Sequence, residues 1–418
     1  MLTVRPISRV SVLGQRLIIL NDANLAIELL DKRSAVHSDR PKMPFAELCF
    51  KAYRKSLHRE IVSKASSFSR FNSLQEVEVR RFILRLLNRP EDLVGHIRKL
   101  DMVTQSIPSS DPLVDLADEA VEQFFLARTA NVFRKQSQAV ADTPFAFVHQ
   151  QMSQPGYEPS FASNLLEGKV LTPGSTEKTV IKWSSATLYA AGADTTVSTT
   201  TSFFLAMALY PEVQHKAQEE IDRVIGPSRL PVESDRPNLP YIDALVKEAL
   251  RWHPVAPMGI PHRSMEDDIC EGYLIPKGSL IIPNIWAFCH DPTGYENPMT
   301  FNPGRFLCET PERDPHYLAF GFGRRVCPGR TLADSNIFLA IAQTLASCHI
   351  SKAVRDGKEM DVCPEFVPGT ISHPAPFEVS VTPRSAQYEE MIRALETEHP
   401  WETAHAEKLW TEFFEGGE

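Results

Sequence analysis

One stretch of eleven residues constrains this chain more than any other. Residues 320–330 read FGFGRRVCPGR, which places Cys327 among glycines, arginines and a proline. Gly321 and Gly323 can adopt backbone conformations that other residues rarely reach, and they leave room for a flat object close to the chain. The proline after the cysteine has no N–H and a preset φ, which suits the first turn of a helix. The sequence therefore predicts that Cys327 lies where a glycine-rich loop meets a helix beginning near Arg330.

This position predicts a ligand role for the sulfur. A helix N-terminus and the neighbouring Arg324 and Arg325 favour negative charge, so the pKa of the Cys327 thiol is expected to be lowered. Gly329 leaves space on the far side of the sulfur. A thiolate beside room for a planar group indicates an axial ligand of haem iron. A lone cysteine is more often an inert buried residue, and a GxG loop can hold phosphate, but no GK[ST] follows this one.

Composition narrows the function classes further. The chain has 418 residues, 43% of them hydrophobic, and a net charge of -9, which argues against a nucleic-acid partner. Its seven cysteines form no CxxC pair, which fits neither a disulfide framework nor a zinc site. The N-terminal residues contain no apolar run of 18, so we expect no membrane anchor there and a chain that is soluble by itself.

The whole string F-G-x-G-R-R-x-C-x-G resembles the haem-binding signature of the cytochrome P450 family. The resemblance covers roughly residues 5–383. It implies a mainly α fold with a small β region, built as a single large haem domain over residues 1–383. Residues 384–418, with nine acidic and three basic side chains, are then an acidic C-terminal extension. The implied cofactor is haem b (iron protoporphyrin IX), and the implied iron ligand is Cys327.

The resemblance also implies which other residues bind the cofactor. The cysteine loop contributes Phe320, Gly321, Gly323 and Gly329. His262 and Arg325 match positions that contact a haem propionate. Arg54 matches the arginine of a W-x-x-x-R pattern with the same role, but Phe50 replaces the tryptophan and has no indole N–H to donate.

A second motif, AAGADTT, lies within residues 181–209, which are expected to form a long buried helix. Gly192 weakens a helix, and threonine hydroxyls can bond to a carbonyl one turn earlier, so we predict a local bulge that admits water. The motif is similar to A/G-G-x-D/E-T of the family, which implies that Asp194 and Thr195 relay protons during oxygen activation. The alternative is an ordinary polar patch on a buried helix.

A third motif is structural. Glu248 and Arg251 are three residues apart in a helical pattern, where they could form a weak surface pair. The resemblance implies instead a buried triad with Arg305 of the FNPGRF segment, supporting the core behind the cysteine loop. Charges buried together must satisfy one another, since removing one partner costs several kcal/mol.

Elsewhere the sequence predicts several local elements. Residues 10–20 are expected to form two strands around a turn at Gly14, and Ser73 with Glu76 is typical of a helix start. Short helices are expected over residues 100–152, with a break near Pro144. Residues 272–284 are typical of a hairpin with its turn at residues 277–278. By the resemblance, residues 255–260 line the substrate cavity, and a terminal hairpin brings its tip, near Ile371, to the substrate.

The N-terminal half is expected to be shortened. Relatives carry longer segments between Pro44 and Cys49, after Leu100 and after Phe125, in regions that serve substrate capture. An incomplete gene prediction or a degenerate paralogue would each explain this difference.

The resemblance implies a haem-thiolate monooxygenase that inserts one oxygen atom from O2 into a hydrophobic small molecule. The residues of its motifs are most similar to those of family members that serve fungal secondary metabolism. No flavin or nicotinamide fingerprint is present, so an NADPH-dependent P450 reductase, with cytochrome b5 as a second candidate donor, is expected to dock on the basic face near Cys327. The expected location is the cytoplasmic side of the endoplasmic reticulum if a full-length anchor exists. Two alternatives remain open, a P450-fold isomerase or dehydratase and a non-catalytic haem-binding paralogue.

Overall fold

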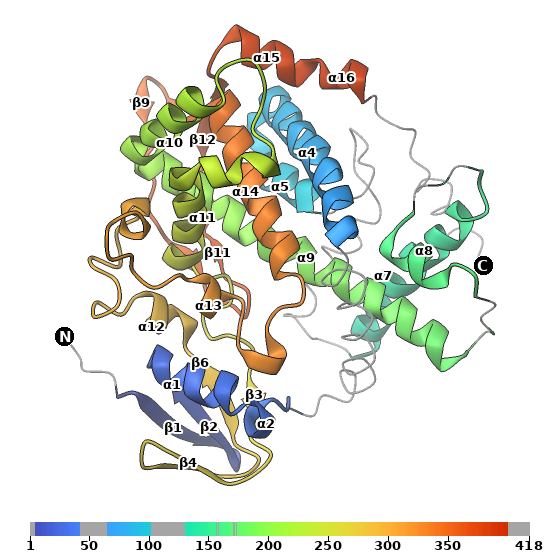
Figure 1. Ribbon diagram of the computed structural model, residues 1–418, viewed down its shortest axis with the longest axis vertical. Coiled ribbons are helices and arrows are strands. Elements are labelled where there is room, and N and C mark those ends of the chain that lie inside the picture. Colours follow the sequence, from blue (N-terminus) through green and yellow to red (C-terminus); the bar gives the residue numbers. More distant parts are fainter. Residues whose placement is uncertain are drawn as a thin grey trace. The chain divides into compact units, whose positions relative to one another are not determined.

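The computed structural model describes residues 5–41, 65–101 and 130–399, apart from residues 156, 158, 170, 171 and 173. The chain divides into two compact units that interleave along the sequence. The first unit comprises residues 1–43, 198–330 and 337–388, and the second comprises residues 44–197, 331–336 and 389–418. The described residues are mainly helical, with one four-stranded sheet and several two-stranded ribbons (Figure 1).

The first unit contains the four-stranded sheet. Its order is β1 (Ile7–Val12), β2 (Gln15–Leu20), β6 (Leu280–Pro283) and β3 (His262–Arg263). β1 and β2 are antiparallel, β2 and β6 are parallel, and β3 is antiparallel to β6. Gly14 has a φ of +80° between the first two strands, so the predicted strand–turn–strand is confirmed.

One core cluster of the first unit lies on this sheet. Ile18 and Leu20 of β2 are at most 2% exposed, and they belong to a cluster that also holds Leu29, Leu30 and Phe288. The helical segments beside the sheet are α1 (Ala23–Ile27), the π-helical η1 (Glu28–Lys32), α2 (Ser34–His37) and α12 (Ile285–Cys289). Asp22 caps α1 by accepting a hydrogen bond from the N–H of Leu25 at 2.8 Å.

Helix α11 (Pro240–Trp252) has a buried inner face, Glu248 included. It packs against α10 (Pro211–Val224), α13 (His316–Ala319) and the 3₁₀ segments η4 (Glu233–Asn238) and η5 (Pro303–Phe306). The 3₁₀ segment η6 (Gly323–Arg325) contacts η1 and α2. α14 (Arg330–Ser347) begins at the residue that the sequence predicts, and its inward side chains Ile337, Phe338, Ile341 and Leu345 are at most 2% exposed.

Short ribbons complete the first unit. They pair β4 (Asp268–Cys270) with β5 (Tyr273–Ile275), β7 (Cys348–Lys352) with β12 (Val379–Pro383), β8 (Val354–Arg355) with β9 (Lys358–Glu359), and β10 (Phe366–Val367) with β11 (His373–Pro374). The terminal hairpin around Ile371 is thus confirmed.

The predicted hairpin over residues 272–284 is wrong. Gly278 does turn the chain, with a φ of +79°, but β5 pairs back to β4 and β6 pairs with β2 and β3. The tight turn of the real hairpin lies at Glu271 and Gly272, which both have positive φ. Sequence periodicity locates strands but does not select their partners, and here β6 finds a parallel partner from the N-terminal segment.

The second unit is helical in its described part. Its elements are α4 (Ala65–Asn88), η3 (Pro90–Asp92), α5 (Leu93–Asp101), α7 (Ala130–Gln151), α8 (Phe161–Leu166), α16 (Leu395–Glu398) and the first part of α9 (Thr176–Leu209). On α4, an apolar stripe is buried, with Val79, Phe82, Ile83 and Leu86 at 0% exposure, while Leu87 is only partly buried.

Two predicted helix boundaries in this unit are wrong. Ser73 lies inside α4, which begins eight residues earlier at Ala65, because neither glycine nor proline interrupts residues 65–88. Pro144 lies inside α7, which continues to Gln151. The neighbouring Phe145 packs in a buried cluster with residues of α8 and α9, and this packing offsets the hydrogen bond that a proline removes from a helix.

The acidic C-terminal extension is helical and packed as far as it is described. In the first unit, Arg384 pairs with Asp222 at 2.5 Å and Tyr388 of α15 (Ala386–Arg393) is 4% exposed. In the second unit, Ile392 is fully buried and Arg393 donates to Asn88 at 3.0 Å.

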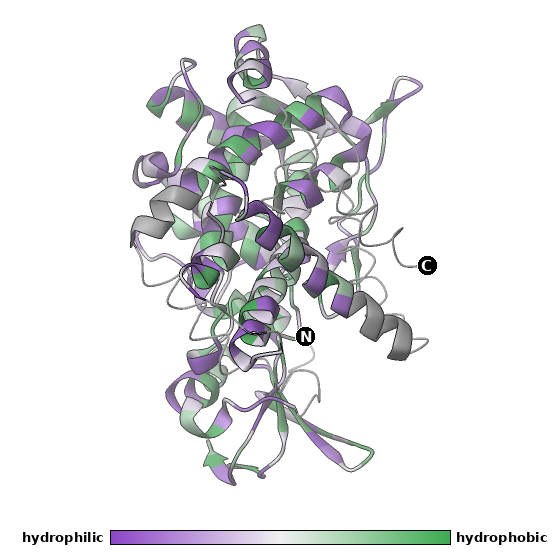
Figure 2. Cartoon of the chain, turned by 90° about the vertical axis from the view of Figure 1, so that its right-hand side faces the viewer, coloured by the Kyte–Doolittle hydropathy of each residue, from purple (hydrophilic) through white to green (hydrophobic). Residues whose placement is uncertain are grey.

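Polar and apolar residues are mixed along the helices (Figure 2). Within the described ranges, none of the helices combines the length and the apolar character that a membrane crossing requires.

Candidate active site

The loop around Cys327 is a series of tight turns between α13 and α14. Gly321 has a φ of +77°, the short η6 follows, and the N–H of Cys327 donates back to the carbonyl of Phe320 at 2.8 Å. The ring of Phe320 stacks on that of His316, with centroids 5.9 Å apart. Cys327 is partly buried, and α14 begins three residues after it at Arg330, as the sequence predicts.

Gly323 has a further reason to be glycine, in addition to the predicted space for a planar group. A Cβ at this position would lie 2.4 Å from the carbonyl oxygen of Leu30 and 3.0 Å from the Cα of Asp31. The residue therefore allows the cysteine loop to pack against the N-terminal helical segment η1. Gly329, in contrast, has a negative φ of -89°, and its Cβ would lie 4.0 Å from the Cys327 sulfur.

The predicted lowering of the Cys327 pKa is wrong for the protein chain alone. Burial raises the pKa of this thiol above its ordinary value, while hydrogen bonds from the backbone at Gly329 and Arg330 and the charge of Arg330 act in the opposite direction. The two arginines named in the prediction do not lower it. Arg324 is exposed, and the Nε of Arg325 donates to the carbonyl of Ser38 at 2.6 Å.

These surroundings nevertheless fit a metal-bound thiolate. Backbone N–H groups are directed at the sulfur, and open space beside it is kept by Gly329. A metal ion deprotonates a coordinating thiol outright, so burial does not prevent ligation. Among the described residues, no group of three or more His, Cys, Asp or Glu side chains could hold a metal ion.

His262 is buried in β3 and fixed as one tautomer. Its Nδ1 lies 2.8 Å from the carbonyl oxygen of His37, which can only accept, so Nδ1 carries the proton. Burial, with the charge of Arg40 as the next cause, lowers the pKa of His262 to about 3. The neutral ring then has no proton on Nε2, so the predicted donation to a propionate requires the ring to gain one.

Two further groups of predicted residues are not tested by the geometry of this loop. Arg54 and Phe50 are outside the described residues. Asp194 and Thr195 lie on α9 in the second unit, whereas Cys327 belongs to the first. The Thr195 hydroxyl donates to the carbonyl of Ala191 at 2.8 Å, the back-bond that the sequence predicts, but the helix continues through the motif without the predicted bulge.

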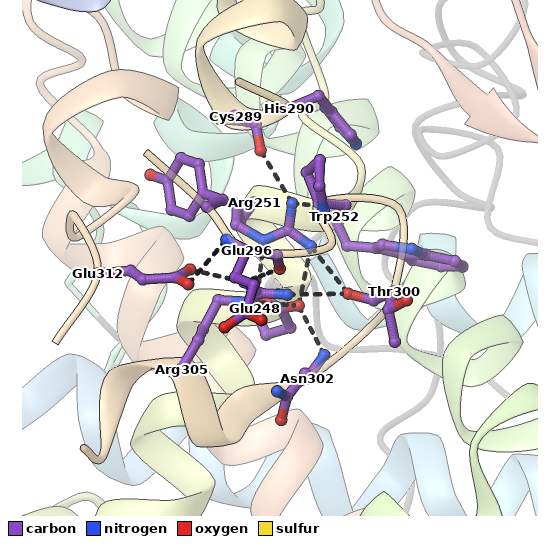
Figure 3. Close-up of polar contacts among 12 residues, drawn as sticks. Glu248, Arg251, Trp252, Cys289, His290, Glu296, Thr300, Asn302, Arg305 and Glu312 are labelled. Atoms are coloured by element: carbon purple, nitrogen blue, oxygen red, sulfur yellow. Dashed lines mark hydrogen bonds and ion pairs between the residues drawn. The ribbon is translucent and has the colours of Figure 1, made fainter. Parts of the chain in front are cut away.

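The structure brings Glu248, Arg251 and Arg305 together (Figure 3). Arg251 donates from Nε and Nη2 to the two carboxylate oxygens of Glu248 at 2.7 and 2.8 Å, and Arg305 donates from Nε at 3.2 Å. The side chains of Glu248 and Arg251 are fully buried, and that of Arg305 is 2% exposed.

A fourth member of this network, Glu312, is missed by the sequence reasoning. Its Oε2 accepts from Nη1 of Arg305 at 2.6 Å, and its Oε1 accepts from the N–H of Glu296 at 2.9 Å. It lies in an irregular loop seven residues after Arg305, where no periodicity relates the two positions. The remaining arginine donors bond to carbonyls of the loop that precedes η5, including those of Pro298 and Thr300, and Arg251 also donates to the carbonyl of Cys289.

The profile of the family described as cytochrome P450 matches residues 90–381, more than half of the chain. The chain is a cytochrome P450. Its curated relatives include a P450 monooxygenase of Aspergillus oryzae, 44% identical over 460 residues that cover 97% of this chain and 87% of the relative. The O-methylsterigmatocystin oxidoreductase of Aspergillus flavus is 38% identical, with coverages of 96% and 85%.

These relatives are fungal secondary-metabolite monooxygenases, and the predicted enzyme class, a P450 monooxygenase, is confirmed. The alignment to the Aspergillus oryzae protein is longer than this P450 itself, so that relative carries residues that this chain lacks. Structures of a zebra fish cytochrome P450, determined with abiraterone and with progesterone, match with a TM-score of 0.75 at 25% and 26% identity. They cover 91% of this chain and 96% and 97% of theirs, which confirms the mainly helical P450 fold.

Proposed function

We propose that this P450 binds haem b through Cys327 and inserts one oxygen atom from O2 into an apolar small molecule of fungal secondary metabolism. The observation that carries the proposal is the cysteine loop, where the partly buried Cys327 precedes the start of α14 and Gly329 places no side chain beside its sulfur. Haem with a thiolate ligand supplies the activation of O2 for insertion into unactivated bonds.

Several residues of the first unit would hold the cofactor. Cys327 would provide the iron ligand, and Phe320 and Gly321 would shape the loop around it. Arg325 and His262 would face the propionates. Because His262 already donates through Nδ1 to His37, it would contribute a second N–H only as an imidazolium, which the carboxylate of a propionate would favour.

Thr195 would control proton delivery. Its hydroxyl proton is engaged with the Ala191 carbonyl, so its oxygen can accept a hydrogen bond without any rearrangement. To donate a proton outward, the hydroxyl must rotate away from that carbonyl. Asp194, next to it on α9, would exchange the proton with solvent.

The substrate is proposed to be apolar because of the segment between α11 and β3. Met258 and Ile260 are 42% and 48% exposed, and they lie in a segment of bends and turns that we expect to line the substrate cavity. Exposed apolar side chains in a row favour an apolar ligand. The Aspergillus flavus relative is named for a substrate, O-methylsterigmatocystin, which does not identify the substrate of this chain.

A carbon monoxide spectrum of the reduced, haem-loaded protein tests the proposal. We expect the red-shifted Soret band of thiolate ligation, and its loss in Cys327→Ser. Cys308→Ser is the matched control, because Cys308 is an exposed free cysteine and its replacement should leave the band unchanged. An unchanged band in Cys327→Ser would refute the ligand assignment.

The proton role is tested by the coupling of NADPH consumption to product. Thr195→Ala should raise the ratio of peroxide formed to product formed by about tenfold or more. One positioned proton donor contributes on the order of 10²-fold to a rate, so its loss slows the productive path. Thr195→Ser keeps the hydroxyl and should retain most of the coupling. Undiminished coupling in the alanine variant would remove Thr195 from the proton path.

A further inference from the structure

Ser372 is a buried junction within the first unit, in the turn that joins β10 to β11. The residue is 3% exposed. Its N–H donates to the carbonyl of Val255 at 2.9 Å, and its hydroxyl donates to the carbonyl of Val367 at 2.8 Å. These two bonds close the hairpin and join it to the segment that follows α11.

The carbonyl of Ser372 is held by two further side chains. The Ser198 hydroxyl of α9 donates to it at 2.6 Å, and Nε2 of His253 lies 3.3 Å from it. Both side chains are buried, at 0% and 3% exposure. Since a carbonyl oxygen only accepts, Nε2 of His253 carries the proton. Burial lowers the pKa of His253 to about 4, so the ring is neutral at physiological pH.

The two donors are themselves fixed. The His253 ring stacks on Phe366 of β10, with centroids 3.6 Å apart and planes 8° apart. Ser198 belongs to the continuous helix α9. The turn is tight as well, since a Cβ at Gly369 would lie 2.5 Å from the carbonyl oxygen of Ile371.

We propose that Ser198 and His253 are positioning residues that fix residues 368–372, here called the hairpin tip, and thereby set which ligands the P450 accepts. The inference rests on the proposed function, in which the tip near Ile371 faces the substrate. It extends that function, because neither donor belongs to the haem or proton-relay residues. Each acts on ligand choice through one backbone carbonyl.

The physical reason is the cost of leaving that carbonyl short of donors. When a buried carbonyl loses one of two hydrogen bonds, the buried conformation becomes less stable relative to one in which water hydrates the carbonyl. A tip of five residues can make this change without unfolding of the hairpin. Loss of the Ser198 hydroxyl should therefore loosen the tip locally. The network of Glu248 and the cysteine loop makes none of these bonds and should stay intact.

The test is hydrogen exchange of the full chain, read by mass spectrometry over peptides that cover residues 366–374. Ser198→Ala and His253→Phe should each speed exchange there by about tenfold, the ratio that corresponds to one lost hydrogen bond. Phenylalanine keeps the stack on Phe366 and removes only the donor. His253→Gln, which offers an N–H, should restore part of the protection.

Ser202→Ala is the matched control, because Ser202 is a buried serine on the same helix whose hydroxyl donates within the helix and makes no bond to the tip. It should lose a comparable amount of overall stability and leave exchange over residues 366–374 unchanged. Equal exchange in Ser198→Ala and Ser202→Ala would overturn the positioning role.

Ligand choice is read separately by optical titration of the haem-loaded protein with imidazole and 4-phenylimidazole. Ser198→Ala should change the ratio of the two dissociation constants by about fivefold or more, with little effect on imidazole alone. A constant ratio would overturn the link to ligand choice. Failure of the haem assignment would appear differently, as protein without a Soret band in which the exchange effect persists.

Discussion

Gly323 is constrained at the scale of a single residue by two separate effects. Its φ of +49° lies in the left-handed region, and a side chain would meet the backbone of Leu30. Gly278 shares the positive φ, at +79°, but has nothing within 4 Å of its virtual Cβ. The pair therefore separates the cost of backbone strain from the cost of a collision.

We expect Gly323→Ala to lower the free energy of unfolding by about 2–4 kcal/mol, the sum of left-handed strain and overpacking, and Gly278→Ala by about 1 kcal/mol. Chemical denaturation measures both values, and haem content should fall only in the first variant. Equal losses of stability would show that Leu30 moves aside and that the loop does not depend on this contact.

His290 carries a pH dependence of its own. The residue is 8% exposed, Nδ1 bonds to the carbonyl of Trp286 at 2.8 Å, and the ring stacks on the indole. Burial lowers the pKa of His290 to about 4. Above the unfolded pKa the folded and unfolded states are both neutral. As the pH falls below it, the unfolded state binds a proton first, so stability is lost from about pH 6.5 down to about pH 4.

Replacing His290 by phenylalanine should flatten the acid side of the stability profile. We expect the wild-type protein to lose up to about 3 kcal/mol more than the variant between pH 6.5 and pH 4. Unfolding midpoints measured across this range give the slope. His215→Phe, at an exposed histidine, should leave the slope unchanged. A variant as acid-sensitive as the wild type would show that the ring is already protonated in the fold.

At the scale of elements, α11 and the loop after η5 are joined by a network whose charges cancel. Glu248 and Glu312 face Arg251 and Arg305, so the network has no net charge when all four groups are ionised. Glu312 is 19% exposed, whereas Glu248 is fully buried. Removing Glu312 leaves Arg305 paired with a single carboxylate, and one N–H of its Nη1 group loses its acceptor.

We expect Glu312→Gln to lower the free energy of unfolding by about 1–3 kcal/mol, because a hydrogen bond to a charged group is lost from a mostly buried arginine. Glu296→Gln is the control, since that exposed residue joins the network only through its backbone, and it should change stability by less than about 0.5 kcal/mol. Equal effects measured by urea denaturation would place Glu312 outside the network.

At the scale of the whole molecule, we expect charge distribution to govern the encounter with an electron donor. The chain carries a net charge of -9, but Arg324 and Arg330 are exposed beside the cysteine loop. An NADPH-dependent reductase with an acidic surface would be attracted to this local positive region and not to the protein as a whole.

Arg324→Glu should slow reduction of the haem by about three- to tenfold at low ionic strength and reduce the salt dependence of that rate. Stopped-flow reduction under carbon monoxide measures the rate, and an unchanged Soret band shows that the ligand is intact. Lys358→Glu makes the same charge change on the exposed ribbon of β8 and β9. A similar slowing in both variants would indicate a general charge effect without a docking site.

The sequence by itself determined the family, the mainly α fold, Cys327 at the start of α14, and the partners Glu248, Arg251 and Arg305. Cys327 and the start of α14 depend on a contiguous pattern, in which glycine, proline and charge act on near neighbours, whereas the pairing of Glu248 with the distant Arg305 followed only from the resemblance to the family. Tertiary structure alone decided that β6 pairs with β2, that Glu312 completes the charge network, and that Gly323 accommodates Leu30.

It also decided that burial raises the pKa of the Cys327 thiol and that Ser198 and His253 meet at one carbonyl. The physical reason is common to all five cases. Burial, strand partners and long-range hydrogen bonds depend on which distant segments come together, and no local pattern in the chain carries that information.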